Sequence, residues 1–184
     1  VNLNEVLLTE AYTLKFEGLP ALIAGDGQIA RLPALAPGAT EPRVGDVVPV
    51  LSGPAAGEYR RVVQAIDPLT LLLDAPLPAG EYAISVAVGF YREVFDNNTI
   101  DTRGGSRAMT FVLNGNHFGT RVTNNKLLGG REVLLQAAAT EKPSHWGWSH
   151  APMFGLVYDG NVMEDSEKGL IVAVEQSKAI RTNV

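Results

Sequence analysis

Four segments in the second half of the chain share one pattern, in which an asparagine follows an apolar residue by three or four positions. The segments begin at Val94, Val122, Val157 and Ile180, and their asparagines are Asn98, Asn125, Asn161 and Asn183. The spacings between these asparagines are 27, 36 and 22 residues. After each of the first three segments a second apolar run follows: AMTFVL, EVLLQA and GLIVAV. Strands joined by a turn and recurring at such an interval predict the stacked coils of a β-solenoid.

A column of asparagines has a physical basis in such a stack. Equivalent residues of successive parallel coils lie about 4.8 Å apart. Asparagine suits turns with left-handed backbone, because its side chain can bond locally to the backbone. Stacked amide side chains can also bond to one another along the stack, which satisfies polar groups that burial would otherwise penalise. We therefore expect parallel coils that are in register at this column.

The V-x-x-x-N-x-I type repeats at 94–100, 122–127 and 157–163, with glycine pairs after the first two, resemble the right-handed parallel β-helix of the pectin-lyase-like superfamily. The resemblance covers residues 89–184. It implies an all-β fold whose C-terminal half consists of right-handed parallel β-helix coils, and we expect these coils to be part of a longer solenoid. Members of the superfamily include lyases, hydrolases, epimerases and esterases of acidic polysaccharides, and also phage tailspikes and adhesins.

Residues 1–88 are expected to form a β-rich subdomain with irregular connections. Residues 45–88 contain four short strand-like runs, and the pattern is typical of an antiparallel meander, of a small barrel or of a flap on a larger structure. Turn signals separate these runs at residues 52–54, 67–68 and 78–80. The part GEYRRVV followed by TLLLDAPL resembles a small β subdomain that occurs beside such helices in polysaccharide-associated proteins.

Two further windows are ambiguous in the sequence. Asn4–Phe16 and Arg131–Lys142 each suit a helix or a strand, since helix-forming residues and alternating apolar residues occur together in both.

Composition excludes several classes of protein. Hydrophobic residues make up 46% of the 184 residues, which is typical of a folded chain. The absence of cysteine excludes disulfide scaffolds, thiolate metal sites and cysteine catalysis. With 15 basic residues dispersed among 20 acidic ones, we expect no nucleic-acid partner. No apolar run approaches the roughly 18 residues of a membrane span. The resemblance implies a secreted or cell-surface location.

The segment EKPSHWGWSHAP, at 141–152, is the strongest candidate for a binding loop. It contains both tryptophans, Trp146 and Trp148, together with His145 and His150. Indole rings stack against the C–H-rich faces of sugars, and long loops on rigid scaffolds often carry function. The alternative is that both rings form an apolar lid over the fold. The two histidines alone predict no metal site, because the sequence supplies no third ligand.

Carboxylates also recur in register with the asparagine column. Asp96 and Asp159 each lie two positions before a column asparagine, with Thr123 between them. Asp101 and Glu164 each lie three positions after one, with Leu128 between them. Each pair would stand two coils apart, at about 10 Å, slightly beyond the roughly 6.5–9.5 Å of inverting glycosidases. The alternative role for these acids is in turn capping and on the solvated surface.

A lyase would need cations to neutralise a uronate carboxylate and a base near the acidic carbon. The repeats supply the cations Arg103, Arg107, Arg121 and Lys126 and the proton-transfer candidates His117 and Tyr91. The candidate catalytic residues are Asp101, Arg103, Arg121 and Asp159. The candidate substrate-binding residues are Trp146, Trp148, His145, His150, Tyr91, Arg107 and Lys126. No cofactor is expected except Ca²⁺, which the oxygens of Asp96, Asp101 or Asp159 could bind.

Two functions follow from these patterns. The first is recognition or processing of a polysaccharide, with an acidic glycan favoured and the tryptophans as its platform. The second is a non-catalytic structural or adhesive module of a larger extracellular or phage-tail protein. A converging groove of tryptophans, arginines and carboxylates would favour the first, and scattered charges would favour the second. Whether the chain is an enzyme stays open at the level of sequence.

Overall fold

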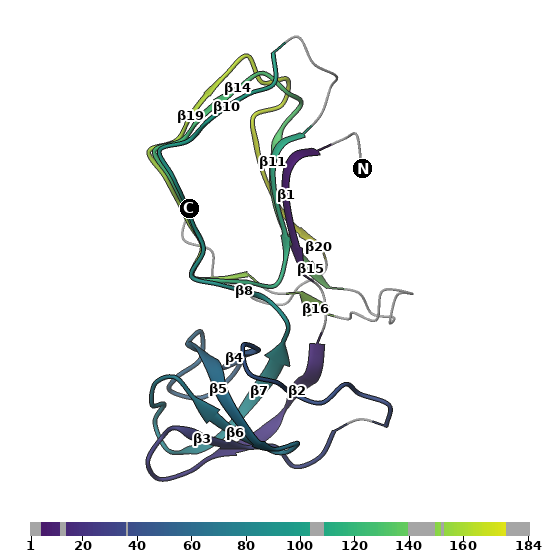
Figure 1. The fold of residues 1–184 in the computed structure, drawn as a ribbon, viewed down its shortest axis with the longest axis vertical. Coiled ribbons are helices and arrows are strands. Elements are labelled where there is room, and N and C mark those ends of the chain that lie inside the picture. The colour runs from purple at the N-terminus through teal and green to yellow at the C-terminus, as the bar shows by residue number, and fades with distance from the viewer. Residues whose placement is uncertain are drawn as a thin grey trace. The chain divides into compact units, whose positions relative to one another are not determined.

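The computed structural model describes residues 5–11, 14–35, 37–103, 109–139, 150–151 and 153–175. Every helix or strand assigned in this part of the chain is a β-strand (Figure 1). Contacts between residues divide the chain into two compact units. One unit consists of Val1–Ala11 and Phe90–Val184, and the other consists of Tyr12–Gly89. The second unit is therefore an insertion between two parts of the first.

The Tyr12–Gly89 unit is a closed antiparallel barrel of six strands. In the order of pairing around the barrel, the strands are β2 (Leu14–Ile23), β3 (Ile29–Arg31), β6 (Thr70–Leu73), β5 (Tyr59–Asp67), β4 (Val47–Pro49) and β7 (Gly80–Ala87). The barrel closes where β7 pairs with β2, far apart in the chain. Closure removes the unpaired strand edges that an open sheet would expose. Of the three sequence alternatives for residues 45–88, the structure shows a barrel.

Alternating side chains fill the barrel. In β6, Leu71 and Leu73 are fully buried while Thr70 and Leu72 are partly exposed, as the two-residue period of a strand requires. Tight turns make the close packing possible. Gly27 has a φ of +76°, and a Cβ at this position would overlap the carbonyl oxygen of Leu77. Only glycine fits this turn without strain.

In the other unit, three chain segments have the same succession of three short strands. The first layer, residues 90–101, contains β8 (Phe90–Tyr91), β9 (Val94–Asp96) and β10 (Thr99–Asp101). The middle layer, residues 117–128, contains β12 (His117–Phe118), β13 (Arg121–Thr123) and β14 (Lys126–Leu128). The last layer, residues 153–164, contains β17 (Met153–Phe154), β18 (Val157–Asp159) and β19 (Val162–Glu164).

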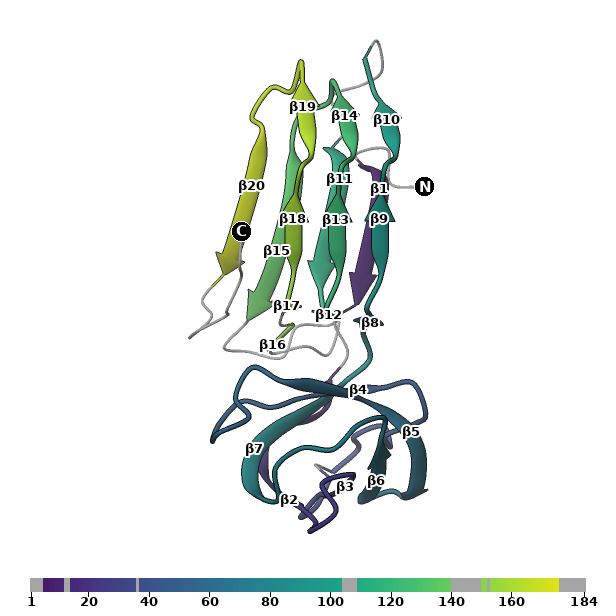
Figure 2. The ribbon, with the colours of Figure 1, turned by 90° about the vertical axis from the view of Figure 1, so that its left-hand side faces the viewer.

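Equivalent strands of the three layers pair in parallel, with the middle layer between the other two. Figure 2 shows these strands side by side in three small sheets. A fourth sheet contains the parallel strands β1 (Glu5–Ala11), β11 (Met109–Gly115), β15 (Val133–Ala139) and β20 (Leu170–Glu175), and the antiparallel strand β16 (His150–Ala151). A core lies among these sheets, and its buried members include Phe111, Val122 and Leu135.

The predicted right-handed parallel β-helix with a small N-terminal β subdomain is wrong, although the all-β class fits. A closed antiparallel barrel takes up residues 14–87, and the parallel strands form small sheets of three to five strands instead of the coils of a solenoid. The repeats report which strands lie in parallel register, and they lie in only one of the two units, so they carry no information on the barrel at Tyr12–Gly89. The described parts of both ambiguous windows contain strands: β1 and the start of β2 in the first window, and β15 in the second.

Candidate functional site

The asparagine column is the best-defined polar feature of the stacked layers. Asn125 is almost fully buried, and its Oδ1 accepts hydrogen bonds from the backbone N–H and the Nδ2 of Asn98, both at 2.9 Å. The next step repeats the arrangement, since Asn161 Oδ1 accepts from the N–H and Nδ2 of Asn125 at 2.9 and 2.8 Å. The predicted register of Asn98, Asn125 and Asn161 is confirmed, while Asn183 lies outside the described residues.

The left-handed residue of each turn stands one position before the column. Asn97, Asn124 and Gly160 have φ values of 55°, 56° and 62°. Glycine and asparagine tolerate this conformation best, which accounts for the repeated N-N and G-N pairs. The column asparagines thus bond between layers, and their neighbours make the turn. The sequence pattern predicts the left-handed turn and the bond between layers for the same asparagine, and the structure divides them between two neighbouring residues.

The Asp96–Thr123–Asp159 column has the register that the sequence predicted. Asp96 accepts hydrogen bonds from Thr123 Oγ1 at 2.6 Å and from Asn124 Nδ2 at 3.0 Å. The bond from Thr123 and then that from Asn124 hold the pKa of Asp96 below its ordinary value. Two strand spacings separate Asp96 from Asp159, about 10 Å, so the two carboxylates do not form a glycosidase pair. Asp96 instead joins two layers.

Two predicted catalytic residues neutralise each other. Arg103 Nε lies 3.0 Å from Asp101 Oδ1, and Arg103 Nη2 lies 2.6 Å from Asp101 Oδ2. This side-chain pairing, with the Arg103 N–H bond to the same carboxylate, lowers the pKa of Asp101 to about 2. Lys126 Nζ forms a similar pair with Glu164 Oε1 at 3.3 Å. A substrate carboxylate would have to displace these internal partners.

The remaining candidates are dispersed. Tyr91 lies in the sheet of β8, β12 and β17, with the guanidinium of Arg92 5.0 Å from its ring centre. Arg121 is exposed on β13 in a different sheet, and Asp159 is exposed on β18 beside it. His150 starts β16, and only its backbone is described. Four further candidates lie outside the described residues: Arg107, His145, Trp146 and Trp148.

His117 is unsuited to proton transfer with a large substrate, because its side chain is fully buried. Its ring stacks on Phe90 with centroids 4.9 Å apart. Its Nδ1 lies 3.4 Å from Thr120 Oγ1 and 3.5 Å from Glu93 Oε2. The histidine therefore anchors the start of the middle layer to the first layer.

One ion pair in the barrel is not predicted by the sequence pattern. Lys15 Nζ lies 2.8 Å from Asp46 Oδ2, and both side chains are more than nine-tenths buried. The Arg43 N–H also donates to Asp46 Oδ2, at 2.7 Å. Alternation with Leu14 and Phe16 would have placed Lys15 on the solvent face of its strand. The ion pair therefore connects β2 with the residue directly before β4, inside the barrel.

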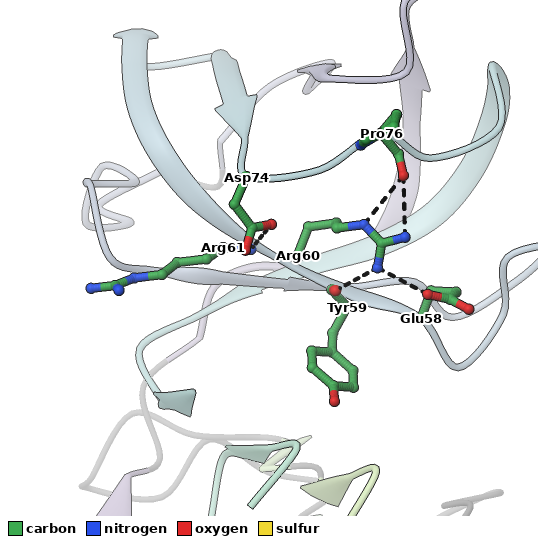
Figure 3. Close-up of polar contacts among 6 residues, drawn as sticks. All are labelled: Glu58, Tyr59, Arg60, Arg61, Asp74 and Pro76. Atoms are coloured by element: carbon green, nitrogen blue, oxygen red, sulfur yellow. Dashed lines mark hydrogen bonds and ion pairs between the residues drawn. The ribbon is translucent and has the colours of Figure 1, made fainter. Parts of the chain in front are cut away.

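Two neighbouring arginines of β5, Arg60 and Arg61, also form hydrogen bonds within the barrel. Arg60 donates to the Pro76 carbonyl from Nε and Nη2, at 3.3 and 3.1 Å, and its Nη1 contacts Glu58 at 2.9 Å (Figure 3). The Arg61 backbone N–H donates to Asp74 Oδ1 at 3.0 Å, while the Arg61 side chain extends away from that carboxylate. Most donors of Arg60 are therefore already occupied within the chain.

Within the described ranges, no group of three or more histidine or acidic side chains is placed to hold a metal ion. The Ca²⁺ site stays a prediction. No helix in the described part of the chain has the length and hydropathy needed to cross a membrane.

A scan against protein-family models and searches of curated proteins and of solved structures found no match. The resemblance to the pectin-lyase-like superfamily therefore rests on the sequence pattern alone. The predicted description as a secreted, polysaccharide-binding β-helix protein needs correction. The β-helix fold that it assumes is wrong, and nothing among the described residues supports polysaccharide binding or secretion.

Proposed function

We propose that the chain is a non-catalytic structural module of a larger protein assembly. One observation carries this proposal: several of the polar side chains that suggested catalysis or metal binding hold neighbouring layers or their own turns together. Asp96 bonds to the middle layer, Asp101 pairs with Arg103, and the asparagine column runs through all three layers. A catalytic centre would instead need such groups to converge, accessible and unpaired, around one substrate position.

The geometry suits a mechanical task. The layers pair through backbone hydrogen bonds at fixed register, and the middle layer contributes the buried amide of Asn125 and the buried core residues Val122 and Leu127. Each layer contacts its neighbours through these bonds, so the stability of the stack comes largely from the interfaces between adjacent layers. A closed barrel adds a unit with no exposed strand edge. The chain thus combines a stack of hydrogen-bonded layers with a closed barrel.

The experiment that tests this function is a titration of the protein with acidic and neutral polysaccharides, followed by tryptophan fluorescence and by assays for released sugar ends. Both tryptophans lie within residues 141–152, so any change has a known origin in the sequence. A structural module gives no saturable change and no product with any glycan. Saturable binding that Trp146→Ala or Trp148→Ala abolishes in folded protein would overturn the proposal.

A further inference from the structure

The fourth sheet contains both the first and the last strand of the described chain. β1 pairs with β11, from Glu5 opposite Met109 to Ala11 opposite Gly115. β15 pairs with both β11 and β20, and all of these pairs are parallel. β1 and β20 therefore run in the same direction at two different edges of one sheet (Figure 2).

This arrangement determines how a pulling force acts on the sheet. A force that enters ahead of β1 acts at Glu5, and a force that leaves after β20 acts at Glu175. These two points are at opposite ends of parallel strands, so the force runs along the strands in a shear geometry. The hydrogen bonds reach across to the neighbouring strand, and all bonds of a strand pair therefore share the load. The pair ruptures only when these bonds break together, and the rate of that step governs forced unfolding.

The centre of the sheet is shielded from water. Phe111, Val112 and Leu113 of β11 are at most 1% exposed. Val133 and Leu135 of β15 are buried to the same extent. Water thus has little access to the backbone bonds between these two strands while a load stretches them. A bond that breaks there is not readily replaced by a bond to solvent, which raises the resistance of the sheet.

The barrel is connected to this sheet in a way that keeps it out of the path of the load. Its chain leaves the first unit after β1 and returns to that unit at Phe90, the start of β8. Since β1 pairs directly with β11, the load passes from β1 into the sheet and reaches the barrel only after β1 has separated. Inside the barrel, Leu14 and Ala87 lie opposite one another on the antiparallel strands β2 and β7. A force between them would open that pair one bond at a time.

We infer that the fourth sheet is a shear clamp, a sheet that bears tension applied along its strands between β1 and β20, and that the inserted barrel is protected from this tension. The inference rests on the proposed structural role and states which part of the module carries a load within an assembly. The barrel then stays folded while the chain on either side of the sheet is under tension.

The test is single-molecule force spectroscopy of the full chain with defined attachment points. The sequence contains no cysteine, so a pair of introduced cysteines determines where the force acts. Glu5→Cys with Glu175→Cys pulls β1 and β20 in opposite directions along their length. Ala11→Cys with Glu175→Cys is the matched control. Both points then lie at the carboxyl ends of the same two strands, and the force opens the sheet from one end.

We expect the first pair of cysteines to require a rupture force roughly twofold or more above that of the control at the same pulling speed. Unfolding of the barrel, residues 12–89, would lengthen the chain by roughly 250 Å. With the first pair, no step of this length should precede rupture of the sheet. Equal rupture forces for the two pairs, or a barrel step before the sheet ruptures, would overturn the inference.

Peptide tags fused ahead of Val1 and after Val184 keep the test valid if a cysteine variant fails to fold, because they change no residue of the sheet. The barrel should again unfold no earlier than the sheet, and a barrel step that comes first would refute its protection. The proposed function fails by a different result, since saturable glycan binding or turnover would contradict the structural role. Equal rupture forces would leave that role intact and remove only the clamp.

Discussion

Replacing Asn125 by alanine tests whether the amide column holds the layers together. The substitution removes four hydrogen bonds. Two are donated to Oδ1, from the N–H and the Nδ2 of Asn98, each at 2.9 Å. Two are donated by Nδ2, to Asn161 Oδ1 and to Phe95 O, each at 2.8 Å. Because the Asn125 side chain is almost fully buried, water cannot simply replace it.

The expected loss of unfolding free energy follows from these bonds. A hydrogen bond contributes about 0.5–1.5 kcal/mol net, and a buried group left without a partner costs about 1–3 kcal/mol. Asn98 is exposed, so solvent can take up part of its lost bonding. We therefore expect Asn125→Ala to destabilise the parallel unit by about 2–4 kcal/mol. Asn98→Ala is the matched control, because it removes the same amide at the exposed end and should cost about 1 kcal/mol or less.

Urea unfolding followed by tryptophan fluorescence measures this difference. The Tyr12–Gly89 unit contains no tryptophan, so the signal comes from the other unit. Circular dichroism at the same urea concentrations shows whether the two units unfold together, which decides how the free energies are extracted. A cost below about 1 kcal/mol for Asn125→Ala, or an equal cost for Asn98→Ala, would refute a stabilising role for the column.

Three further predictions concern single contacts. Lys15→Met leaves the Asp46 charge buried and should destabilise the barrel by about 3–5 kcal/mol in thermal unfolding, whereas the double variant with Asp46→Leu should regain most of that loss. The Asp101 carboxylate should stay ionised in an NMR titration until pH about 2, and its small contribution to stability, present above the pKa of the unfolded chain, is lost as pH falls through that value. Arg103→Ala should move that pKa upward, and an unchanged value would show that the pair does not set it. Gly27→Ala should cost about 1–3 kcal/mol, because the turn has a positive φ and no room for a Cβ.

The register of the three layers could be predicted from the sequence because each layer repeats the same local requirements. A left-handed turn residue, a column asparagine and an inward apolar residue recur together, as in Asn124, Asn125 and Val122. Each requirement selects a residue type with little ambiguity. The alignment of Asp96, Thr123 and Asp159 can be predicted in the same way, because the register set by the asparagines also sets which residues of adjacent layers lie opposite one another.

The barrel and the place of the N-terminal strand could not be predicted in the same way. Closure depends on β2 pairing with β7, and β1 joins the parallel unit by pairing with β11, about a hundred residues later. Neither pair of strands shares a repeated motif. Pairing across such long loops also requires no particular residue type at either strand, so no local sequence pattern indicates it. The string EVLL occurs at residues 5–8 and at 132–135, but Leu7 and Val133 lie opposite the same residue of β11, Phe111, so the two strings are one residue out of register and predict no pairing.

The charges of the three layers favour stacking in this order. Lys126 of the middle layer forms an ion pair with Glu164 of the last layer, and its charge also helps to lower the pKa of Asp101 in the first layer. Arg121 likewise helps to lower the pKa of Asp96. Like charges directly opposite one another on adjacent strands are destabilising, so an acidic layer stacks more favourably on a basic layer than on another acidic one. Edge strands that carry charge are a common protection against uncontrolled pairing. The acidic side chains of Asp159 and Glu164 give β18 and β19 such a charge.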